Sequence, residues 1–419
     1  MFIMESVLKK WTSVIKSLER KTATNIRQIA NQWSWLMLGK IVGAIVALLL
    51  ASMYAHYLTQ EQYGIYKYVL VVFAIVAVFT LQGMQDASQR AIARKHDATF
   101  WETFKIRNKF GVLTAVCAFG FGLYYLLQHN YTLGIIFSVS APFLIFLNTS
   151  SHYNSILMGR QLFKQTSINN TLIQICTSIT IIGAVFFTSN IYWLVAAFLF
   201  SGIFFSLLGF IHTIKKYPLN DTPDPEALSY GKHMSILGIV SIATNQAAPF
   251  LLWHFLGPVQ LAIYAFALAA VSQMRGIFKL LTTTMAFPKL AKLETHILKA
   301  SLPKKVLIAH CFTIPTAILL ALIIPYLYHL LFPTYLESII YAQAMTILLG
   351  FSPMRLYSTA LMTHGSPRAI HTYSITNSVL LLTSMVVLIP FFGIWGVVYA
   401  NIITQTITNA VVIYLFKRM

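Results

Sequence analysis

The sequence predicts an all-α integral membrane protein, with about twelve transmembrane helices in two six-helix halves around a central cavity. Hydrophobic residues make up 57% of the chain and charged residues only 10%. A soluble domain carries about 25% charged residues, so this chain has too few charges to cover a water-exposed surface. Runs of about 20 apolar residues recur along the whole length, and lipid-embedded runs must be helices because lipid offers the backbone no hydrogen bonds.

The hydrophobic runs are joined by short connections, and no large polar domain interrupts them. We take each run as one span, with limits that carry an error of a few residues. The predicted spans cover 33–57, 65–85, 108–127, 131–152, 170–188, 191–212, 234–256, 260–285, 304–330, 337–362, 370–391 and 394–416.

Basic residues are distributed unevenly between the connections. The chain has 30 Lys and Arg against 11 Asp and Glu, which gives a net charge of +19. The odd-numbered connections hold no Lys or Arg, and Lys67 alone lies close to one of them. This positive-inside pattern predicts that both termini lie in the cytoplasm. It also explains the positive net charge, so binding to nucleic acid is not needed to account for it. The odd-numbered connections are 58–64, 128–130, 189–190, 257–259, 331–336 and 392–393.

The chain divides into four predicted segments. Residues 1–32 are basic, and apolar positions at helical spacing within 5–20 indicate an amphipathic helix on the inner membrane surface, or alternatively a disordered basic tail. Six spans follow over 33–212. A loop rich in Pro and acidic residues, 213–233, then leads to six more spans over 234–416.

Short phrases recur in matching places of the two halves. "HYLTQEQYGIY" (56–66) resembles "HFLGPVQLAIY" (254–264), and "YNSILM" (153–158) resembles "YSTALM" (357–362). Each half has an even number of spans, so both halves start on the same side and form a parallel repeat. Two similar halves that rock about a shared cavity are suited to alternating access.

Residues for covalent or metal chemistry are not arranged in any recognisable site. Cys117, Cys176 and Cys311 lie in apolar runs without metal-ligand spacing, so we predict no metal, cofactor or disulfide. The only acids predicted on the outer side are Glu61 and Glu337, and the outer connections are short. We therefore predict no catalytic residues and no enzyme.

Several phrases resemble those of a known family. "LTQEQYGIY" (58–66) followed by a span and "SQRAIARK" (88–95) looks like the first hairpin of polysaccharide flippases. "FLGPVQLAIYAF" (255–266) followed by "FPKLAKL" (287–293) looks like the same hairpin in the second half, and "IPFFGIWGVVYA" (389–400) is a typical C-terminal turn. The chain thus resembles the Wzx-type O-antigen flippases of the MOP exporter superfamily, which also contains the MATE drug exporters.

This resemblance implies a MATE-like fold and a function. Such flippases move undecaprenyl-diphosphate-linked oligosaccharides from the cytoplasmic to the periplasmic leaflet of the bacterial inner membrane. The resemblance further implies membrane lipids as neighbours, coupling to H+ or Na+, and contact with the polysaccharide polymerase of the same pathway. A cavity for this substrate must shelter a polar sugar and neutralise a diphosphate.

The eighth span carries a polar stripe that suits this substrate. Ser272, Arg275, Lys279 and Thr282 are spaced at i, i+3, i+7 and i+10 and share one helix face. Arg275 lies roughly 21 Å beyond Leu261 along the helix, past the middle of the bilayer. We predict that Arg275 and Lys279 contact the diphosphate, since an Arg fork fits phosphate oxygens. The alternative is that they snorkel to the inner headgroups.

Other polar residues within spans are further candidates. Lys40 and Arg355 are predicted to bind substrate or to snorkel. Arg90 is a substrate candidate, but its spacing from Asp86 favours a local ion pair. Asp86 is the candidate for ion coupling. Asn245 lies in mid-span, where it either meets sugar hydroxyls or joins helices.

A MATE-type drug exporter is the alternative function with the same architecture. It would favour acidic residues in the cavity to hold cationic drugs. The charges predicted within the membrane here are mostly basic, which suits an anionic substrate.

Overall fold

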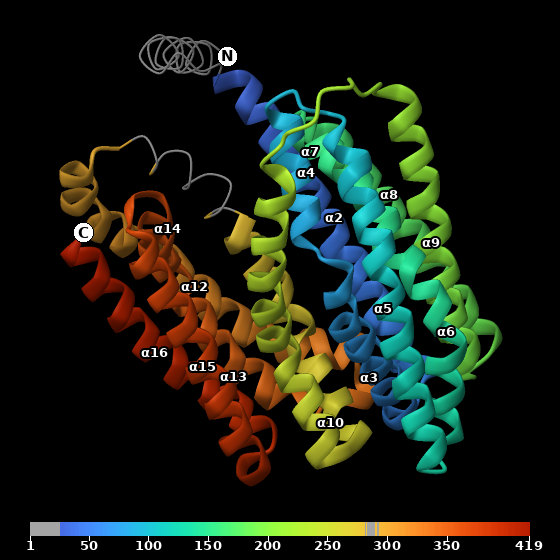
Figure 1. Ribbon diagram of the computed structural model, residues 1–419. Coiled ribbons are helices and arrows are strands. Elements are labelled where there is room, and N and C mark those ends of the chain that lie inside the picture. Colours follow the sequence, from blue (N-terminus) through green and yellow to red (C-terminus); the bar gives the residue numbers. More distant parts are fainter. Residues whose placement is uncertain (1–25, 281, 283–289, 291–292) are drawn as a thin grey trace, which may run out of the picture.

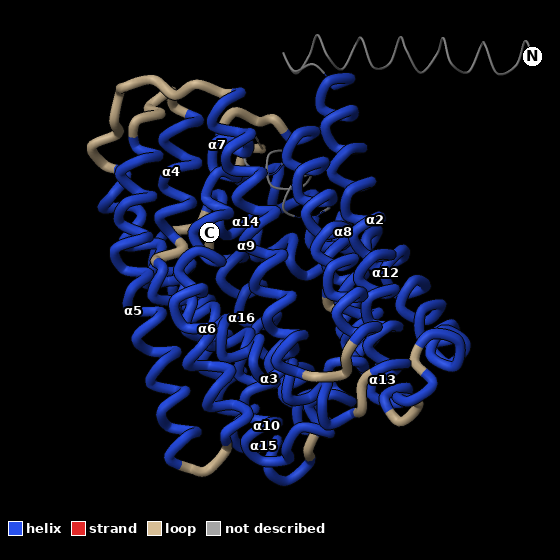
Figure 2. Tube along the Cα trace, turned by 90° about the vertical axis from the view of Figure 1, so that its right-hand side faces the viewer, coloured by secondary structure: helices blue, strands red, loops and turns tan. Residues whose placement is uncertain are grey.

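The computed structural model describes residues 26–280, 282, 290 and 293–419. All regular structure within these ranges is helical, and the rest of the described backbone forms turns and loops (Figure 2). The all-α prediction is therefore confirmed for this part of the chain. The predicted amphipathic helix over 5–20 lies outside the described residues.

Helices α2 to α9 form an N-terminal bundle, drawn from blue to green in Figure 1. Small residues let its helices pack closely: a Cβ at Gly122 of α5 would lie 2.8 Å from the backbone nitrogen of Ser138 in α6. The elements are α2 (Ile26–Tyr57), α3 (Gln60–Val76), η1 (Ala77–Thr80), α4 (Gly83–Ala93), α5 (Thr99–Leu127), α6 (Tyr131–Thr149), η2 (Ser150–Tyr153), α7 (Asn154–Gly159), α8 (Phe163–Phe187) and α9 (Ile191–Lys216).

A second bundle, drawn from yellow to red in Figure 1, follows in the C-terminal part of the chain. Its elements are α10 (Ala227–Leu280), α12 (Thr295–Leu331), η4 (Pro333–Tyr335), α13 (Ser338–Gly350), η5 (Ser352–Met354), α14 (Arg355–His364), α15 (Pro367–Phe392) and α16 (Ile394–Arg418). The outer surface of both bundles is apolar, with large side chains such as Leu127, Phe187 and Phe391 exposed, as a lipid-facing surface requires.

Helix α10 consists of two arms that fold back on each other. Its 54 residues would measure roughly 81 Å as one straight helix, far more than the bilayer core of about 30 Å. Gly257 breaks it with φ 81° and ψ −171°, a conformation that only glycine adopts readily. The described residues contain 11 helices long and apolar enough to cross a membrane, and α10 crosses twice. The twelve predicted spans are therefore present.

The turns that join alternate spans gather on one side of the molecule, which we call the turn face. The side chain of Gln60 donates a hydrogen bond to the Thr334 carbonyl (2.8 Å), and that of Gln62 donates to the Ser189 carbonyl (3.2 Å). The opposite side, where α2 begins and α16 ends, is the terminal face (Figure 1). The turns on the turn face lie at 58–59, 128–130, 188–190, 257, 332–337 and 393. The odd-numbered connections therefore share one face, as the charge pattern predicts.

The internal repeat extends to irregular structure. In the first half, α6 ends in the 3-10 turn η2 and continues as the short helix α7. In the second half, α13 ends in η5 and continues as α14. The phrases "YNSILM" and "YSTALM" fall in these two places. The same interruption in both halves supports the predicted parallel repeat.

The second span begins and ends about five residues earlier in the chain than the predicted range 65–85, since it covers Gln60–Thr80. Helix α3 begins directly after Thr59, because the Thr59 and Gln62 side chains each accept a hydrogen bond from the other residue's backbone N–H. The helical stretch then ends at Thr80, and Leu81 turns left-handed with φ 49°. The Thr-x-x-Gln pattern in the sequence predicts this capping box. No sequence pattern predicts a left-handed turn at a leucine.

Helices also extend into two segments predicted to lie outside the membrane spans. Helix α2 begins at Ile26, inside the segment 1–32. Helix α9 continues to Lys216 and α10 begins at Ala227, so both enter the predicted loop 213–233. The chain between α9 and α10, here called the linker, is correspondingly shorter.

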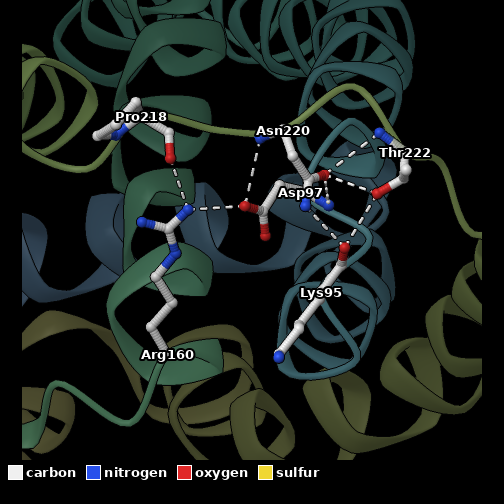
Figure 3. A network of polar contacts seen from close by, with 6 residues as sticks. All are labelled: Lys95, Asp97, Arg160, Pro218, Asn220 and Thr222. Carbon is white, nitrogen blue, oxygen red and sulfur yellow. Dashed lines mark hydrogen bonds and ion pairs between the residues drawn. The ribbon is translucent and has the colours of Figure 1, made fainter.

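The linker is tied to the N-terminal bundle by a polar network (Figure 3). The Arg160 guanidinium donates to the Asp97 carboxylate and to the Pro218 carbonyl, both at 2.7 Å. Asn220 accepts from the Asp97 backbone N–H (2.9 Å) and donates to the Lys95 carbonyl (2.8 Å). These bonds join the linker to the α4–α5 and α7–α8 turns. We therefore expect the linker to move with the N-terminal bundle.

Removing the Arg160 side chain is expected to lower thermal stability. Asp97 has a side chain only 8% exposed, so Arg160→Ala leaves a nearly buried carboxylate without its cation. The loss is on the order of 1–3 kcal/mol, the usual cost of an unsatisfied buried hydrogen-bonding group. Thermal unfolding of the purified protein in detergent measures it. Glu294→Gln is the control, because the Glu294–His296 pair is 75% and 76% exposed and such pairs contribute little. Equal unfolding temperatures for the two variants would refute a stabilising role for the network.

Candidate functional site

A cavity of about 740 Å³ lies between the two bundles. Helices α2, α3, α8 and α9 line it from the N-terminal bundle, and both arms of α10 line it from the C-terminal bundle. The volume falls in the range of about 300–1,000 Å³ that is typical of small-ligand sites. The predicted central cavity is therefore present, and it is built from both halves of the repeat.

The cavity wall is mostly apolar, and amide, hydroxyl and tyrosine side chains are set into it. Ser272 and Asn245, two of the predicted site residues, both line it. Among the described residues that line it, none is Asp or Glu. Amide and hydroxyl groups of this kind can bind sugar hydroxyls. The amide side chains are Asn170, Gln174, Asn245, Gln246 and Gln273, and the tyrosines are Tyr54, Tyr63, Tyr66 and Tyr264.

Aromatic rings close the cavity toward the turn face. The rings of Phe266 and Tyr335 stack at 3.7 Å between centroids, and Tyr63 packs on Phe266 at 4.8 Å. Gly64 of α3 lies so close to α10 that a Cβ there would overlap the backbone of Pro258. The structure therefore has the two bundles in contact at the turn face.

Three of the predicted cations lie beyond the terminal-face end of the cavity without lining it, and we call them the cation cluster: Lys40, Arg275 and Arg355. A Cβ at Gly276 would lie 3.0 Å from the Lys40 ammonium, so Lys40 of α2 packs against Gly276 of α10, the residue that follows Arg275 in the chain. Arg275 in turn lies within electrostatic range of Arg355. All three side chains are half-buried. Segments far apart in the sequence thus place three positive charges on the same side of the cavity.

The predicted stripe on α10 runs from the cavity toward the terminal face. Ser272 lines the cavity, Arg275 follows one turn later, and Lys279 is exposed one turn further. The Thr282 hydroxyl donates to the Phe278 carbonyl (3.0 Å). Lys279 thus lies beyond the cavity, which agrees better with a headgroup contact than with a place inside the cavity.

Asp86 and Arg90 lie outside the central cavity. They line a separate pocket of about 490 Å³ at the terminal-face side, together with Tyr230. The ion pair predicted between them does not form, because the Arg90 guanidinium lies over the Tyr230 ring at 4.5 Å. The turn at Leu81 redirects α4 so that Arg90 reaches α10, where the ring face attracts a cation.

Lys67 lines the cavity, although it is not among the site residues predicted from the sequence. It lines the cavity from α3, and its ammonium lies 5.4 Å from the centroid of the Tyr63 ring. In the sequence it stands out only as the one basic residue close to a predicted outer connection. The i, i+4 spacing from Tyr63 to Lys67 was the available signal, because it allows a cation to lie over a ring on the same helix.

Arg107 is a second cation that the sequence did not single out, because it precedes the apolar run of its helix. It is only 2% exposed. Its guanidinium donates to the carbonyls of Asn148 (2.8 Å) and Thr80 (3.3 Å) and to the Gln85 side chain (3.1 Å), and it contacts His152 (2.9 Å). These partners come from α4, α6 and the two 3-10 turns. Arg107 therefore joins elements within the N-terminal bundle.

Several solved structures have a similar fold. The chain is similar to the lipid II flippase MurJ in its inward closed conformation, with a TM-score of 0.65, 15% identity, and coverage of 90% of this chain and 86% of the other. It is similar to an outward-facing MATE family multidrug transporter of the MOP superfamily, with a TM-score of 0.60, 14% identity, and 92% and 95% coverage. It is also similar to a mutant of the Vibrio cholerae MATE transporter VcmN, with a TM-score of 0.60, 14% identity, and coverage of 94% of this chain and 97% of the other.

The fold and the cavity between two repeats define a multi-pass membrane protein with the MOP exporter fold. The sequence profile described as "Polysaccharide biosynthesis protein" matches residues 29–294. The chain belongs to this family. No curated protein sequence matches it.

Proposed function

We propose that the protein is a flippase for undecaprenyl-diphosphate-linked oligosaccharides, the repeat units of O-antigen or a similar surface polysaccharide. It carries them from the cytoplasmic to the periplasmic leaflet of the bacterial inner membrane by alternating access. The terminal face, with both chain termini, lies in the cytoplasm, and the turn face lies in the periplasm. Transport is coupled to antiport of H+ or Na+.

The observation that carries this proposal is the cation cluster on the terminal-face side of a cavity whose described lining carries amides but no Asp or Glu. A lipid-linked diphosphate is anionic, and Lys40, Arg275 and Arg355 supply three positive charges where it would enter from the terminal face. Desolvated Arg and Lys are the side chains that best neutralise phosphate oxygens. The amide side chains in the cavity wall beyond them can bind a neutral, hydroxyl-rich glycan.

A MATE-type exporter of small molecules is the second candidate, favoured by the likeness to MATE structures. A cationic drug requires negative charge in its site. Since none of the described residues that line the cavity is Asp or Glu, the cavity fits an anionic substrate better.

The coupling ion needs a group that changes charge or coordination during transport. Asp86 remains our proposal for that group, acting in the pocket that it shares with Arg90 at the terminal-face side and not in the central cavity. Contact with the polymerase of the same pathway is also proposed, from the resemblance alone.

The proposal is tested by deleting the gene and analysing the lipopolysaccharide ladder on a gel, while lipid-linked repeat units are quantified in the same cells. We expect loss of the ladder and accumulation of repeat units on the cytoplasmic face. An unchanged ladder with new sensitivity to cationic dyes would instead support the drug exporter.

A further inference from the structure

We propose that Lys67 forms a second anion-binding site at the turn-face end of the cavity, separate from the cation cluster. This inference rests on the proposed function and extends it. The site would bind an oxoanion of the substrate, either a phosphate group or the carboxylate of an acidic sugar.

The two sites are too far apart to hold one diphosphate between them. Gly64 of α3 packs against Pro258 of α10, so these residues lie at the same depth, and both helices run from there toward the terminal face (Figure 1). Lys67 is three residues beyond Gly64 and Arg275 is seventeen beyond Pro258. At a rise of 1.5 Å per residue, they are separated by roughly 20 Å along the helices. A diphosphate, which is two linked phosphate tetrahedra, is far shorter.

The surroundings of Lys67 favour an anionic ligand. Lys67 is half-buried and, within the described part of the chain, forms no ion pair with a carboxylate. A positive charge taken out of water is costly unless a negative charge compensates it. The Tyr63 ring supplies only a weak cation–π contact. A bound oxoanion would accept hydrogen bonds from the ammonium, which has three donors.

Headgroup snorkelling, the usual explanation for a lysine near a helix end, does not fit this position. Helix α3 is largely enclosed by its neighbours, with Tyr63, Tyr66 and Tyr68 all buried around Lys67. The ammonium therefore faces the cavity rather than the lipid.

Unpaired amides further along the cavity, between Lys67 and the cation cluster, are placed to bind the neutral part of a sugar. The side chains of Asn170, Gln246 and Gln273 line the cavity and make no hydrogen bond to other described residues. Amides offer both donors and acceptors, as sugar hydroxyls require. The ligand chemistry along the cavity is thus an acidic group at Lys67 and hydroxyl groups between Lys67 and the cation cluster.

The anion can come from two parts of the substrate. In the first case, an acidic sugar of the repeat unit reaches Lys67 while the diphosphate stays at the cation cluster. In the second case, the diphosphate itself moves from the cluster to Lys67 during transport. Both cases require the same charge at the same place.

Binding of two probes to the full-length protein in lipid nanodiscs tests the proposal. Inorganic pyrophosphate and glucuronate are titrated by calorimetry into wild type, Lys67→Gln and Lys67→Arg. The control is Lys164→Gln, because Lys164 also lies over a ring, that of Trp35 at 4.6 Å, but does not line the cavity. Thermal unfolding confirms that each variant is folded.

We expect Lys67→Gln to weaken binding at least tenfold for one probe, with Lys67→Arg and Lys164→Gln close to wild type. Loss of glucuronate binding indicates an acidic sugar. Loss of one of two pyrophosphate sites indicates a moving diphosphate. If both probes bind Lys67→Gln with unchanged affinity and stoichiometry, or if neither binds wild type, the proposed site is wrong. The flippase function would still stand on the deletion phenotype.

Discussion

Arg275→Gln is expected to reduce transport on the order of 100-fold, because losing one partner of a desolvated, hydrogen-bonded charge pair costs about 2–5 kcal/mol. Arg275 is a half-buried member of the cation cluster, with Lys40 packed against the neighbouring Gly276 and Arg355 in electrostatic range. Arg275→Lys should retain part of the activity, since it keeps the charge but loses the fork that fits phosphate. Complementation of the deletion strain, read as the polysaccharide ladder, gives the measurement.

Arg94→Gln is the matched control for this variant. Arg94 is also an arginine, but its side chain is 49% exposed and lies 3.9 Å from Asp224 at the terminal face, away from the cavity. We expect a ladder like that of wild type. If Arg275→Gln and Arg275→Ala both leave the ladder intact at normal protein levels, Arg275 does not bind the diphosphate, and the snorkelling interpretation is correct.

Gly64→Val is expected to prevent the two bundles from closing at the turn face, and so to abolish transport. Any Cβ at Gly64 would overlap the Pro258 carbonyl, which is backbone and cannot rotate away. Overpacking of this kind costs about 1–3 kcal/mol or more. An alternating-access carrier needs both closed states, so a protein held open at this face cannot complete its cycle.

Closure at the turn face can be measured by cross-linking. Cysteines replacing Gln60 and Thr334, whose side chain and carbonyl are hydrogen-bonded at 2.8 Å, are joined with a short bifunctional reagent in a background without native cysteines. We expect Gly64→Val to lower the cross-linked fraction strongly. Gly183→Val is the control, because a Cβ at Gly183 would meet nothing within 4 Å. Equal cross-linking in both variants would show that the Gly64 contact does not govern closure.

The topology was predictable because its physical cause is local. A bilayer requires long apolar helices, and the asymmetry of Lys and Arg sets which connections share a face. The kink at Gly257 was equally predictable, because one predicted span ends at 256, the next begins at 260, and Gly-Pro lies between them. The shift of the second span was not predictable, because a leucine rarely adopts the left-handed conformation found at Leu81 and no sequence pattern marks it.

The candidate site was only partly predictable. The stripe through Ser272 and Arg275 follows from helix periodicity, and it does begin in the cavity. The expected Asp86–Arg90 pair fails because spacing permits a contact without enforcing it, and the Tyr230 ring on a distant helix holds Arg90 instead.

By itself, the sequence determined the helical class, the number of spans, the repeat and the alternation of connections, since each follows from hydrophobic length, periodicity or charge along the chain. Only the tertiary structure decided which polar groups share a space. Lys40 packs against Gly276, and Lys67 faces the cavity rather than the membrane surface, through the packing of α2 and α3 against α10. Such contacts join residues far apart in the chain, so no local pattern encodes them.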